Sequence, residues 1–307
     1  MKPILVVGSA NVDMVVTTDR LPQPGQTLLG GRFATFLGGK GANQAVAAAR
    51  AGGTVGFLGC VGRDDAGARL RAGLAAEGID TRHLLNVNEP SGTALITTVP
   101  GGDNMIVVAP GANLSLEPDH LPAAAFDAVG TVLAQLEIAM PSVQAAATMA
   151  RACGATFILD PAPAVPLPPG LIRQVDWLTP NESEARLLLD DTMGDLDGAR
   201  ASLALQARGA RGVVLTMGAR GVVLLEAGRD PVTIAAQRVA AVDTTAAGDA
   251  FNGAFAVALA EGAEPGAAVQ FAIAAASIAV TREGAQAAMP HRREIDAMLS
   301  ADAEERR

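Results

Sequence analysis

The stretch GANQAVAAARAGGTVGFLGCVG, residues 41–62, decides the fold class, because a helical pattern gives way to a strand pattern within it. Residues 41–53 predict a helix that ends in glycines, and residues 54–62 predict a buried strand. Outward from this stretch, residues 4–8 (ILVVG) predict a strand. Residues 64–78 predict a helix with an acidic start and a glycine stop. Alternation of strand and helix is typical of a parallel sheet that is covered by helices.

The same rhythm continues along the chain. Short apolar runs lie at 131–138, 156–160, 176–180 and 212–218, and most of them lead to a helical segment. We therefore predict one α/β domain over residues 1–307, with a mostly parallel central sheet and helices on both faces. The alanine-rich segment 265–281 predicts a buried helix rather than a membrane span. In such folds, ligands bind beyond the carboxyl ends of the strands.

Two stretches interrupt the rhythm. Residues 13–36 and 91–110 are rich in strand-forming residues, contain Pro-Gly and Gly-Gly turns, and leave no room for a helix. We predict that they form hairpins of a small second sheet close to the carboxyl ends of the main sheet. A sheet in that place can serve as a lid over a site, or it can be an ordinary sheet edge.

Composition narrows the classes of partner. The chain has 307 residues, 50% hydrophobic content and a net charge of −9 without a block of like charge, which argues against a nucleic-acid partner. Its two cysteines, Cys60 and Cys153, lie far apart, which argues against a disulfide framework or a zinc site and favours the cytoplasm. The first apolar run meets Asp13 early and predicts a strand rather than a signal peptide, so we expect no membrane partner.

Asp249 stands at the start of a predicted helix in DTTAAGDAFNGAFAVALA, residues 243–260. Asp249 follows Ala246, Ala247 and Gly248, whose small side chains let an anion approach the unpaired N–H groups of a helix N-terminus. A carboxylate there can take a proton from a hydroxyl while the amides stabilise the transferred charge. A simple N-cap aspartate would show the same local pattern.

A second glycine-rich segment, FLGGKGANQA at 36–45, carries a lysine but lacks the Walker pattern, because Ala34 stands at the first glycine position and Gly41 follows the lysine. Glycines followed by Lys40 and Asn43 at a helix start predict a polar pocket. The alternative is a tight strand-to-helix turn with a solvated lysine.

Two further polar groups stand at predicted strand ends. In GSANVD, residues 8–13, Asn11 and Asp13 alternate in strand fashion at the end of the first strand and face one side, which suits neighbouring sugar hydroxyls. Turn chemistry explains them equally well. Glu137 ends the apolar run 131–138, where it needs partners if it is buried and none if it is solvated.

The segment TPNESEA, residues 179–185, places Asn181 and Glu184 three residues apart at a helix start, on one face. Their oxygens suit Mg²⁺, which binds few protein groups and keeps several waters, but a helix cap uses the same residues. TMGARG, residues 216–221, joins two strand-like runs and also fits a plain hairpin turn.

Together these segments resemble the ribokinase/PfkB family of carbohydrate kinases over nearly the whole chain. GGKGANQA and DTTAAGDAFNGA are similar to the two family signatures, and PNESEA, TMGARG and AVTREGAQ follow in the expected order. The resemblance implies a mostly parallel α/β fold with a β lid. It also implies ATP-dependent phosphorylation of a sugar hydroxymethyl group, for which we expect the 5-hydroxyl of D-ribose.

The resemblance also implies roles for individual residues. Asp249 is similar to the general base, and residues 246–249 to the anion hole. The implied sugar contacts are Asn11, Asp13, Gly39, Lys40, Asn43, Glu137 and Asp249. The implied ATP contacts are Asn181, Thr216, Met217, Gly218, Ala219, Arg220, Gly221 and Gly248.

The same resemblance implies that the protein binds two ions and forms a homodimer. Mg²⁺ is linked to Asn181 and Glu184, through water. A monovalent cation, K⁺, is expected beside Asp243, Thr245, Ala279, Arg282 and Gly284, held mostly by backbone carbonyls. The last position of that shell is commonly a serine and is Ala288 here, which predicts a weakened site. The lid is expected to form a homodimer interface.

Other activities remain open at this stage. A sugar phosphate as substrate is disfavoured, because Asn11 and Asp13 present no positive charge. A nucleoside kinase lacks an aromatic platform, since the chain has no Tyr and one Trp, although Phe33 and Phe36 lie in the predicted lid. 2-Deoxyribose differs from ribose by one hydroxyl. A catalytically silent sugar-binding regulator is opposed by the intact Asp249 and its anion hole.

Overall fold

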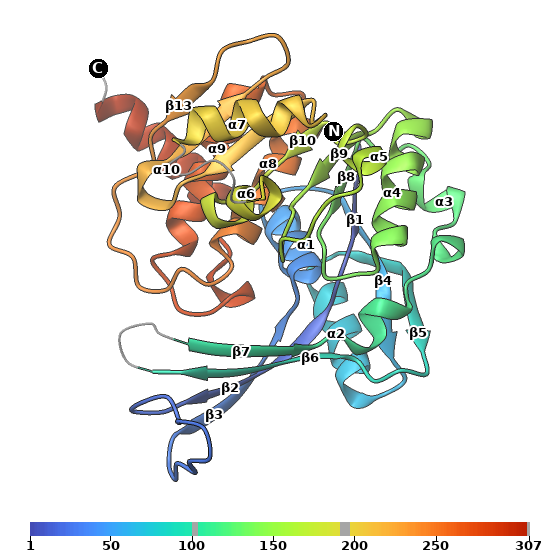
Figure 1. Cartoon of the computed structure of the whole chain (residues 1–307), viewed down its shortest axis with the longest axis vertical. Coiled ribbons are helices and arrows are strands. Elements are labelled where there is room, and N and C mark those ends of the chain that lie inside the picture. Colours follow the sequence, from blue (N-terminus) through green and yellow to red (C-terminus); the bar gives the residue numbers. More distant parts are fainter. Residues whose placement is uncertain (100–103, 191–196, 306–307) are drawn as a thin grey trace.

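The computed structural model describes residues 1–99, 104–190 and 197–305, and Figure 1 shows a helix-covered sheet with a second, smaller sheet projecting from it. The main sheet has the strand order β13-β12-β11-β10-β9-β8-β1-β4-β5. In this order, the strands from β5 to β11 pair in parallel, and β12 pairs antiparallel with both β11 and β13. The predicted mostly parallel α/β sheet is thereby confirmed.

The strands of the main sheet are β1 (Ile4–Val7), β4 (Val55–Gly62), β5 (Asp80–Val87), β8 (Thr131–Ala134), β9 (Thr156–Leu159), β10 (Trp177–Leu178), β11 (Gly212–Thr216), β12 (Val222–Leu225) and β13 (Val232–Ile234). Its central strands are buried on both faces, as expected of parallel strands between helical layers.

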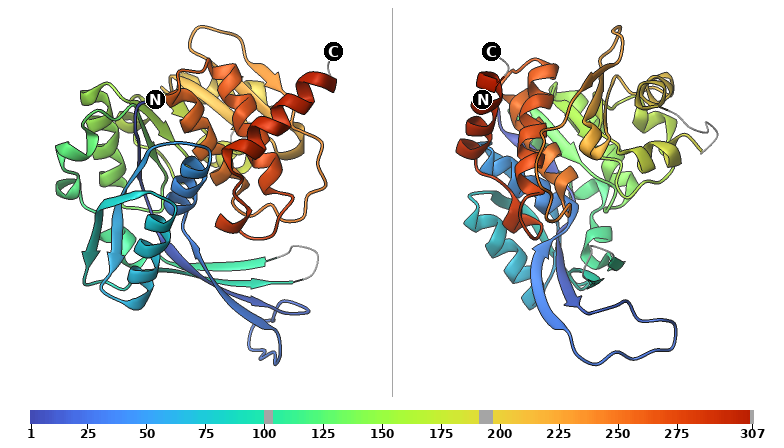
Figure 2. Two further views of the ribbon diagram at one scale, coloured as in Figure 1. Left: turned by 180° about the vertical axis from the view of Figure 1, so that it is seen from behind. Right: turned by 90° about the vertical axis from the view of Figure 1, so that its left-hand side faces the viewer.

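Helices cover both faces of this sheet (Figure 2). One layer contains α1 (Lys40–Arg50), α2 (Asp65–Ala76), α8 (Ala247–Ala260), α9 (Pro265–Ala279) and α10 (Arg292–Glu305). The other contains α3 (Ala123–Phe126), α4 (Met140–Cys153), α5 (Pro169–Ile172), α6 (Glu182–Leu188) and α7 (Gly198–Ala207). Short 3₁₀ turns are η1 (Gly111–Ser115), η2 (Pro118–His120), η3 (Gly218–Arg220) and η4 (Gln286–Ala288).

The helix predicted at 265–281 is α9, and most of its second half is buried in the first layer. In the parts of the chain that the structure describes, no helix is both long and apolar enough to cross a membrane.

Helices α1 and α8 pack unusually closely. A Cβ atom added to Gly253 would lie 2.6 Å from the Cβ of Ala47 and 2.7 Å from the backbone nitrogen of Ala48. The glycine in α8 and the alanines of α1 therefore allow the two backbones to approach. This contact brings the polar start of α1 beside Asp249 in the first turn of α8.

The small sheet contains β2 (Asn11–Thr17), β3 (Arg32–Gly38), β6 (Gly92–Thr98) and β7 (Asn104–Ala109), in the order β3-β2-β6-β7. Since β1 ends at Val7 and β2 begins at Asn11, the small sheet starts at the carboxyl edge of the main sheet (Figure 1). The predicted second sheet is confirmed, and the turn expected near 100–103 lies outside the described residues.

One local prediction is wrong. Asn11 and Asp13 do not end the first strand of the main sheet; they begin β2, which belongs to the small sheet, so this sheet starts at 11 rather than 13. The physical reason is that residues 8–10 leave the ladder of β1, and the next residues pair with β3 and β6 instead. Asn11 and Asp13 still share one face, because they are two residues apart in a strand.

Candidate active site

A pocket of about 570 Å³ lies beyond the carboxyl ends of β9, β10 and β11, at the start of α8. Its position is the one expected for a ligand site in a parallel α/β sheet. The lining residues are Lys40, Asp160, Thr179, Asn181, Glu182, Ser183, Glu184, Thr216, Gly218, Thr244, Ala246, Ala247, Gly248, Asp249 and Asn252. Four motif segments of the sequence, GGKGANQA, PNESEA, TMGARG and DTTAAGDAFNGA, therefore meet at one pocket.

The turn into α8 has the features of an anion cradle. Ala246 is the N-cap residue and adopts the left-handed conformation, with φ 57°. The N–H of Ala247 donates to the Thr244 carbonyl at 3.3 Å, so this amide is already engaged. Gly248 and Asp249 follow in the first helical turn, where N–H groups have no acceptor within the helix. Their amides and the positive end of the helix dipole suit an anionic group.

The Asp249 side chain is buried and held by two amides. Asn43 Nδ2 donates to Asp249 Oδ2 at 3.0 Å, and Gln44 Nε2 donates to Asp249 Oδ1 at 3.0 Å. Burial raises the pKa of Asp249, while the Lys40 ammonium and the two amides act in the opposite direction. A simple N-cap would instead accept from its own helix, so this carboxylate does more than cap α8.

Lys40 is the cation of the pocket. Burial alone would lower the pKa of its ammonium, but the surrounding carboxylates raise it overall, with Asp249 the strongest and Asp160 next. Burial raises the pKa of Asp160 to about 8, against the attraction of Lys40. Lys40 lines the pocket and is half-buried beside these acids, so the alternative of a fully solvated lysine does not hold.

The residues predicted to contact a sugar lie close to this cluster. Asn113 Nδ2 donates to Asn11 Oδ1 at 2.7 Å, and the N–H of Ala10 donates to Asn113 Oδ1 at 2.9 Å, which orients both amides. Burial raises the pKa of Asp13 to about 7, with Glu137 and Asp249 adding to the effect. Asp13 is thus electrostatically close to Asp249 although 236 residues separate them in the sequence.

Glu137 has the partners that a buried carboxylate needs. Its Oε2 atom accepts from the Ser9 hydroxyl at 2.6 Å and from the N–H of Lys40 at 3.0 Å. It lies in the loop after β8 rather than at the strand tip, because β8 ends at Ala134. Glu137 is half-buried, and its hydrogen bonds are the partners that the buried interpretation required.

The turn between β3 and α1 requires glycine at two positions. Gly39 has φ 87°, a left-handed conformation that L side chains rarely adopt. A Cβ on Gly41 would lie 2.5 Å from the backbone nitrogen of Ser9. These glycines let the start of α1 lie directly against the β1–β2 connection, which ends at Asn11, the first residue of β2.

Asn181 and Glu184 form a capping box at the start of α6, and both residues also line the pocket. The N–H of Glu184 donates to Asn181 Oδ1 at 2.9 Å, and the N–H of Asn181 donates to Glu184 Oε2 at 2.8 Å. Burial raises the pKa of Glu184. The capping and ligand interpretations of these residues are thus compatible, since the box fixes two side chains that face the pocket.

The segment 216–221 contributes only in part. Thr216 and Gly218 line the pocket, whereas Met217, Ala219, Arg220 and Gly221 are not among its lining residues. Arg220 instead pairs with Glu182. The segment is also the hairpin connection between antiparallel β11 and β12, so the hairpin interpretation is confirmed.

The residues predicted around a monovalent cation lie together. The N–H of Thr245 donates to Asp243 Oδ1 at 2.9 Å, and the N–H of Gly284 donates to Asp243 Oδ2 at 2.9 Å. The N–H of Arg282 donates to the Ala279 carbonyl at 3.1 Å. The segments 243–245 and 279–288 therefore flank the anion-cradle turn.

Several polar residues of the site were missed by sequence reasoning. They are Ser9, Gln44, Asn113, Gln135, Asp160 and Gln286. Gln44 Nε2 donates to Asp160 Oδ2 at 2.7 Å as well as to Asp249, and its Oε1 accepts from Gln135 at 2.5 Å. Gln44 left a signal, as a polar residue in the otherwise apolar run after Asn43, and so did Asp160, as the charged end of the apolar run 156–160.

Comparison with known proteins agrees with this geometry. The model of the pfkB family of carbohydrate kinases matches residues 1–292. The chain belongs to this family. Among curated members, it is 43% identical over 304 residues to a ribokinase of Bacillus subtilis, covering 98% of this chain and 100% of that protein. It is 40% identical over 297 residues to a ribokinase of Haemophilus influenzae, covering 95% and 97%.

Solved structures of pfkB kinases share the fold. A ribokinase of Thermotoga maritima superposes with a TM-score of 0.91 at 38% identity, covering 98% of this chain and 100% of that one. An Arabidopsis thaliana ribokinase complexed with ribose and ATP superposes with a TM-score of 0.89 at 33% identity, covering 97% and 98%. The predicted family resemblance is confirmed.

Proposed function

We propose that this pfkB kinase transfers the γ-phosphate of ATP to the 5-hydroxyl of D-ribose, giving ribose 5-phosphate and ADP. The observation that carries the proposal is the buried Asp249 carboxylate, held by two amides in the first turn of α8 beside that turn's N–H groups. The ribokinases to which the chain is similar, one of them complexed with ribose and ATP, support the choice of substrates.

In this proposal Asp249 is the general base. Its carboxylate takes the proton of the sugar hydroxyl as the oxygen forms a bond to the γ-phosphorus, and the bond from that phosphorus to the β-phosphate oxygen breaks. The N–H groups of Gly248 and Asp249 and the Lys40 ammonium stabilise the charge on the transferred group. Such transfer requires positioning and charge neutralisation more than covalent help.

The sugar would lie between the small sheet and α1. Asp13 and Asn11 come from β2, Glu137 from the loop after β8, and Asn43 from α1, so three segments supply polar groups to one region. A ring with several hydroxyls suits this mixture of carboxylates and amides, with Gly39 allowing close backbone approach. ATP would occupy the pocket beside Asn181, Thr216 and Gly218.

The pocket also fits the two ions. Asn181 and Glu184 are fixed by their capping box and face the pocket, which suits a hydrated Mg²⁺ that would neutralise phosphate charge. The segments joined through Asp243 suit a K⁺ ion that is bound mostly by carbonyl oxygens. Ala288 is buried there and offers no side-chain oxygen, so we propose weakened but retained activation by K⁺.

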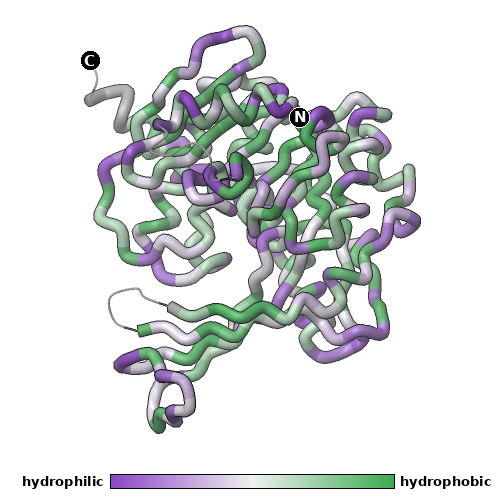
Figure 3. The backbone as a smooth tube through the Cα atoms, in the orientation of Figure 1, coloured by the Kyte–Doolittle hydropathy of each residue, from purple (hydrophilic) through white to green (hydrophobic). Residues whose placement is uncertain are grey.

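We also propose a homodimer through the small sheet. Met14, Leu95 and Val107 lie opposite one another across β2, β6 and β7 and are 38%, 55% and 65% exposed. Phe33 and Met105 add exposed apolar surface to the same face, and Figure 3 shows how hydrophobic these strands are. An apolar sheet face of this kind is a protein-interaction surface, and symmetry makes a second copy its simplest partner.

The test of function is a coupled ADP-release assay with ribose, 2-deoxyribose, fructose 6-phosphate and adenosine. We expect the highest kcat/KM with ribose. Preference for adenosine would instead support a nucleoside kinase, and absence of ADP release with every substrate would support a silent sugar-binding regulator. For the dimer, analytical ultracentrifugation should show that Leu95→Glu shifts the protein to a monomer.

A further inference from the structure

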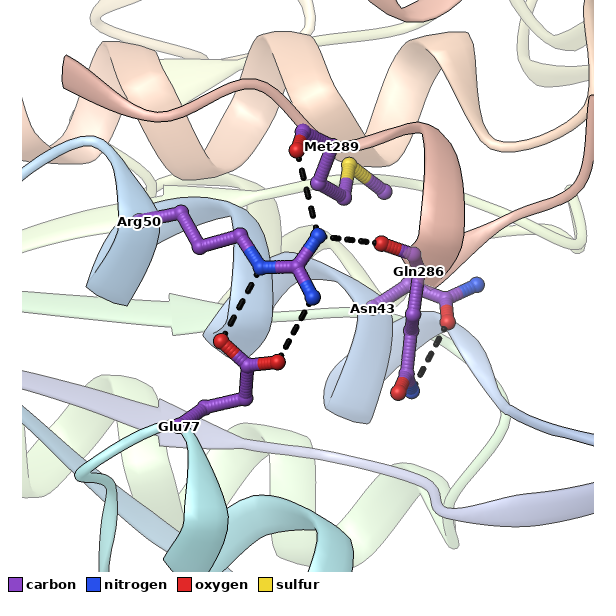
Figure 4. Close-up of polar contacts among 5 residues, drawn as sticks. All are labelled: Asn43, Arg50, Glu77, Gln286 and Met289. Carbon is purple, nitrogen blue, oxygen red and sulfur yellow. Dashed lines mark hydrogen bonds and ion pairs between the residues drawn. The ribbon is translucent and has the colours of Figure 1, made fainter. Parts of the chain in front are cut away.

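A 3₁₀ turn near the C-terminus is tied to one face of α1 (Figure 4). The Arg50 Nη1 atom donates to the carbonyl of Gln286 at 2.6 Å and to the carbonyl of Met289 at 3.1 Å. The same guanidinium donates to both carboxylate oxygens of Glu77, at 2.9 Å and 2.6 Å. A guanidinium fixed by a bidentate carboxylate is a rigid anchor, so the backbone of η4 is held in place.

The side chain of Gln286 extends from this anchored turn to the start of α1 (Figure 4). Its Nε2 atom donates to Asn43 Oδ1 at 3.2 Å, and Asn43 Nδ2 donates to Asp249 Oδ2 at 3.0 Å. Asn43 is 6% exposed, so water cannot substitute freely for either partner. The chain of contacts therefore runs from Arg50 through Gln286 and Asn43 to the carboxylate.

This order of contacts decides which way the Asn43 amide faces. An asparagine amide has an acceptor oxygen and a donor NH₂ at nearly equal distances from Cγ, and either can point toward a neighbour. The Asp249 carboxylate only accepts, so Asn43 turns its NH₂ toward Asp249, and its oxygen then faces Gln286, which supplies the donor that holds this orientation. Reversal would place the Asn43 oxygen against a carboxylate oxygen and its NH₂ against the NH₂ of Gln286, so both contacts would be lost.

We propose that Gln286 is a positioning residue for the general base. By fixing the orientation of the Asn43 amide, it keeps the Asp249 carboxylate in place for the sugar hydroxyl, without touching either substrate. This inference rests on the proposed kinase function for its effect on rate. The orientation of Asn43 itself is independent of what the substrate is.

The kinetic test is a double-mutant cycle of Gln286→Met and Asn43→Ala at saturating K⁺. Methionine keeps the length of the side chain and removes the donor. Loss of this hydrogen bond between two neutral amides predicts about a fivefold fall in kcat, with the KM for ATP changed by less than about twofold. In the Asn43→Ala background, Gln286→Met should change kcat by less than about twofold, because the two residues act through one contact.

The control is Gln270→Met, the same substitution at an exposed position on α9, which should leave kcat at the parent value. Additive effects of Gln286→Met and Asn43→Ala would overturn the proposal and point to a general loss of packing. A changed half-activating K⁺ concentration as the sole effect of Gln286→Met would overturn it as well, because the residue would then act through the cation segment.

A second measurement needs no turnover. In protein with ¹⁵N-labelled asparagine, the side-chain NH₂ signal of Asn43 is identified by its loss in Asn43→Ala. We expect Gln286→Met to shift this signal and to speed its exchange with solvent several-fold, and Gln270→Met to leave it unchanged. An unchanged Asn43 signal in Gln286→Met would overturn the proposal. An inactive parent with the expected shift would contradict only the kinase function.

Discussion

Replacing Asp249 by asparagine removes the proposed base while keeping the shape of the side chain. The carboxylate accepts from Asn43 on one oxygen and from Gln44 on the other. Asparagine can accept from only one of them, so its NH₂ group meets a second NH₂ group. That local mismatch should cost about 1–3 kcal/mol of folding stability, the usual penalty for a buried polar group without its partner.

The catalytic effect should be larger than this structural effect. General base catalysis contributes about 10²–10⁴-fold, or roughly 3–5 kcal/mol of barrier. We expect kcat for ribose to fall in that range in Asp249→Asn, while the KM for ATP stays within a few-fold. Apart from Gly248, whose backbone the substitution leaves unchanged, the residues expected to contact ATP come from other segments.

The pH dependence of kcat separates a base from a cap. Burial raises the pKa of Asp249, so in the parent kcat should fall on acidification at a pH above the ordinary carboxylate range of about 4. The cause is that the protonated form cannot accept the hydroxyl proton. Asp249→Asn should lose this acid limb. Initial rates from pH 5 to 9 at saturating substrates measure it, and a variant with near-parent kcat and the same limb would refute the reasoning.

The remaining predictions concern the sugar, the strained turn, the cation and the anchor. Asp13→Ala should raise the KM for ribose about 10–100-fold and leave the KM for ATP unchanged in initial-rate assays; the reverse pattern would place the sugar pocket elsewhere. Ala246→Gly should stabilise the fold slightly, by less than about 1 kcal/mol of unfolding free energy measured in urea. Glycine relieves the φ 57° conformation of Ala246 (about 1–2 kcal/mol), and this gain exceeds the cost of the added entropy of the unfolded chain (about 0.4–1 kcal/mol). A clear loss of stability would contradict this prediction. Ala288→Ser should lower the half-activating KCl concentration several-fold at constant ionic strength, and a flat response in parent and variant would exclude K⁺ activation. The hydrogen bond from Arg50 lowers the pKa of Glu77 from 4.5, so the ion pair stabilises the fold above pH 4.5 and ceases to do so as the pH falls through the lowered pKa of the folded protein. Glu77→Gln should therefore lower Tm at pH 7, and the difference in Tm from the parent should shrink below pH 4.5. A difference that stays constant with pH would argue against the pair.

Much of this architecture was predictable from local pattern. The helix–strand switch at 41–62 and the apolar runs after it predicted the parallel sheet, because helix and strand differ in the period of their apolar residues. The stretches around 13–36 and 91–110 predicted the small sheet. The boundary at Asn11 was missed, since a chain that leaves one sheet and joins another keeps the same extended pattern.

The candidate site was predictable where a segment carries its own chemistry. Small residues before Asp249 at a helix start suit an anion cradle as well as a simple N-cap, and the spacing of Asn181 and Glu184 predicts a capped helix start. Both features depend on residues within one turn of each other. They therefore leave a trace in the sequence whatever the rest of the chain does.

Only the tertiary structure decided which of these segments bring their charged side chains close enough to interact. The Asp249 carboxylate raises the pKa values of both Asp13 and Lys40, which lie far from it in the sequence, and Gln44 joins Asp249 to Asp160. Nothing near Gln286 in the sequence shows that it faces Asn43. Such contacts arise from the close packing of α1 on α8 and from the Arg50 anchor of η4, and low solvent exposure makes each of these polar contacts strong.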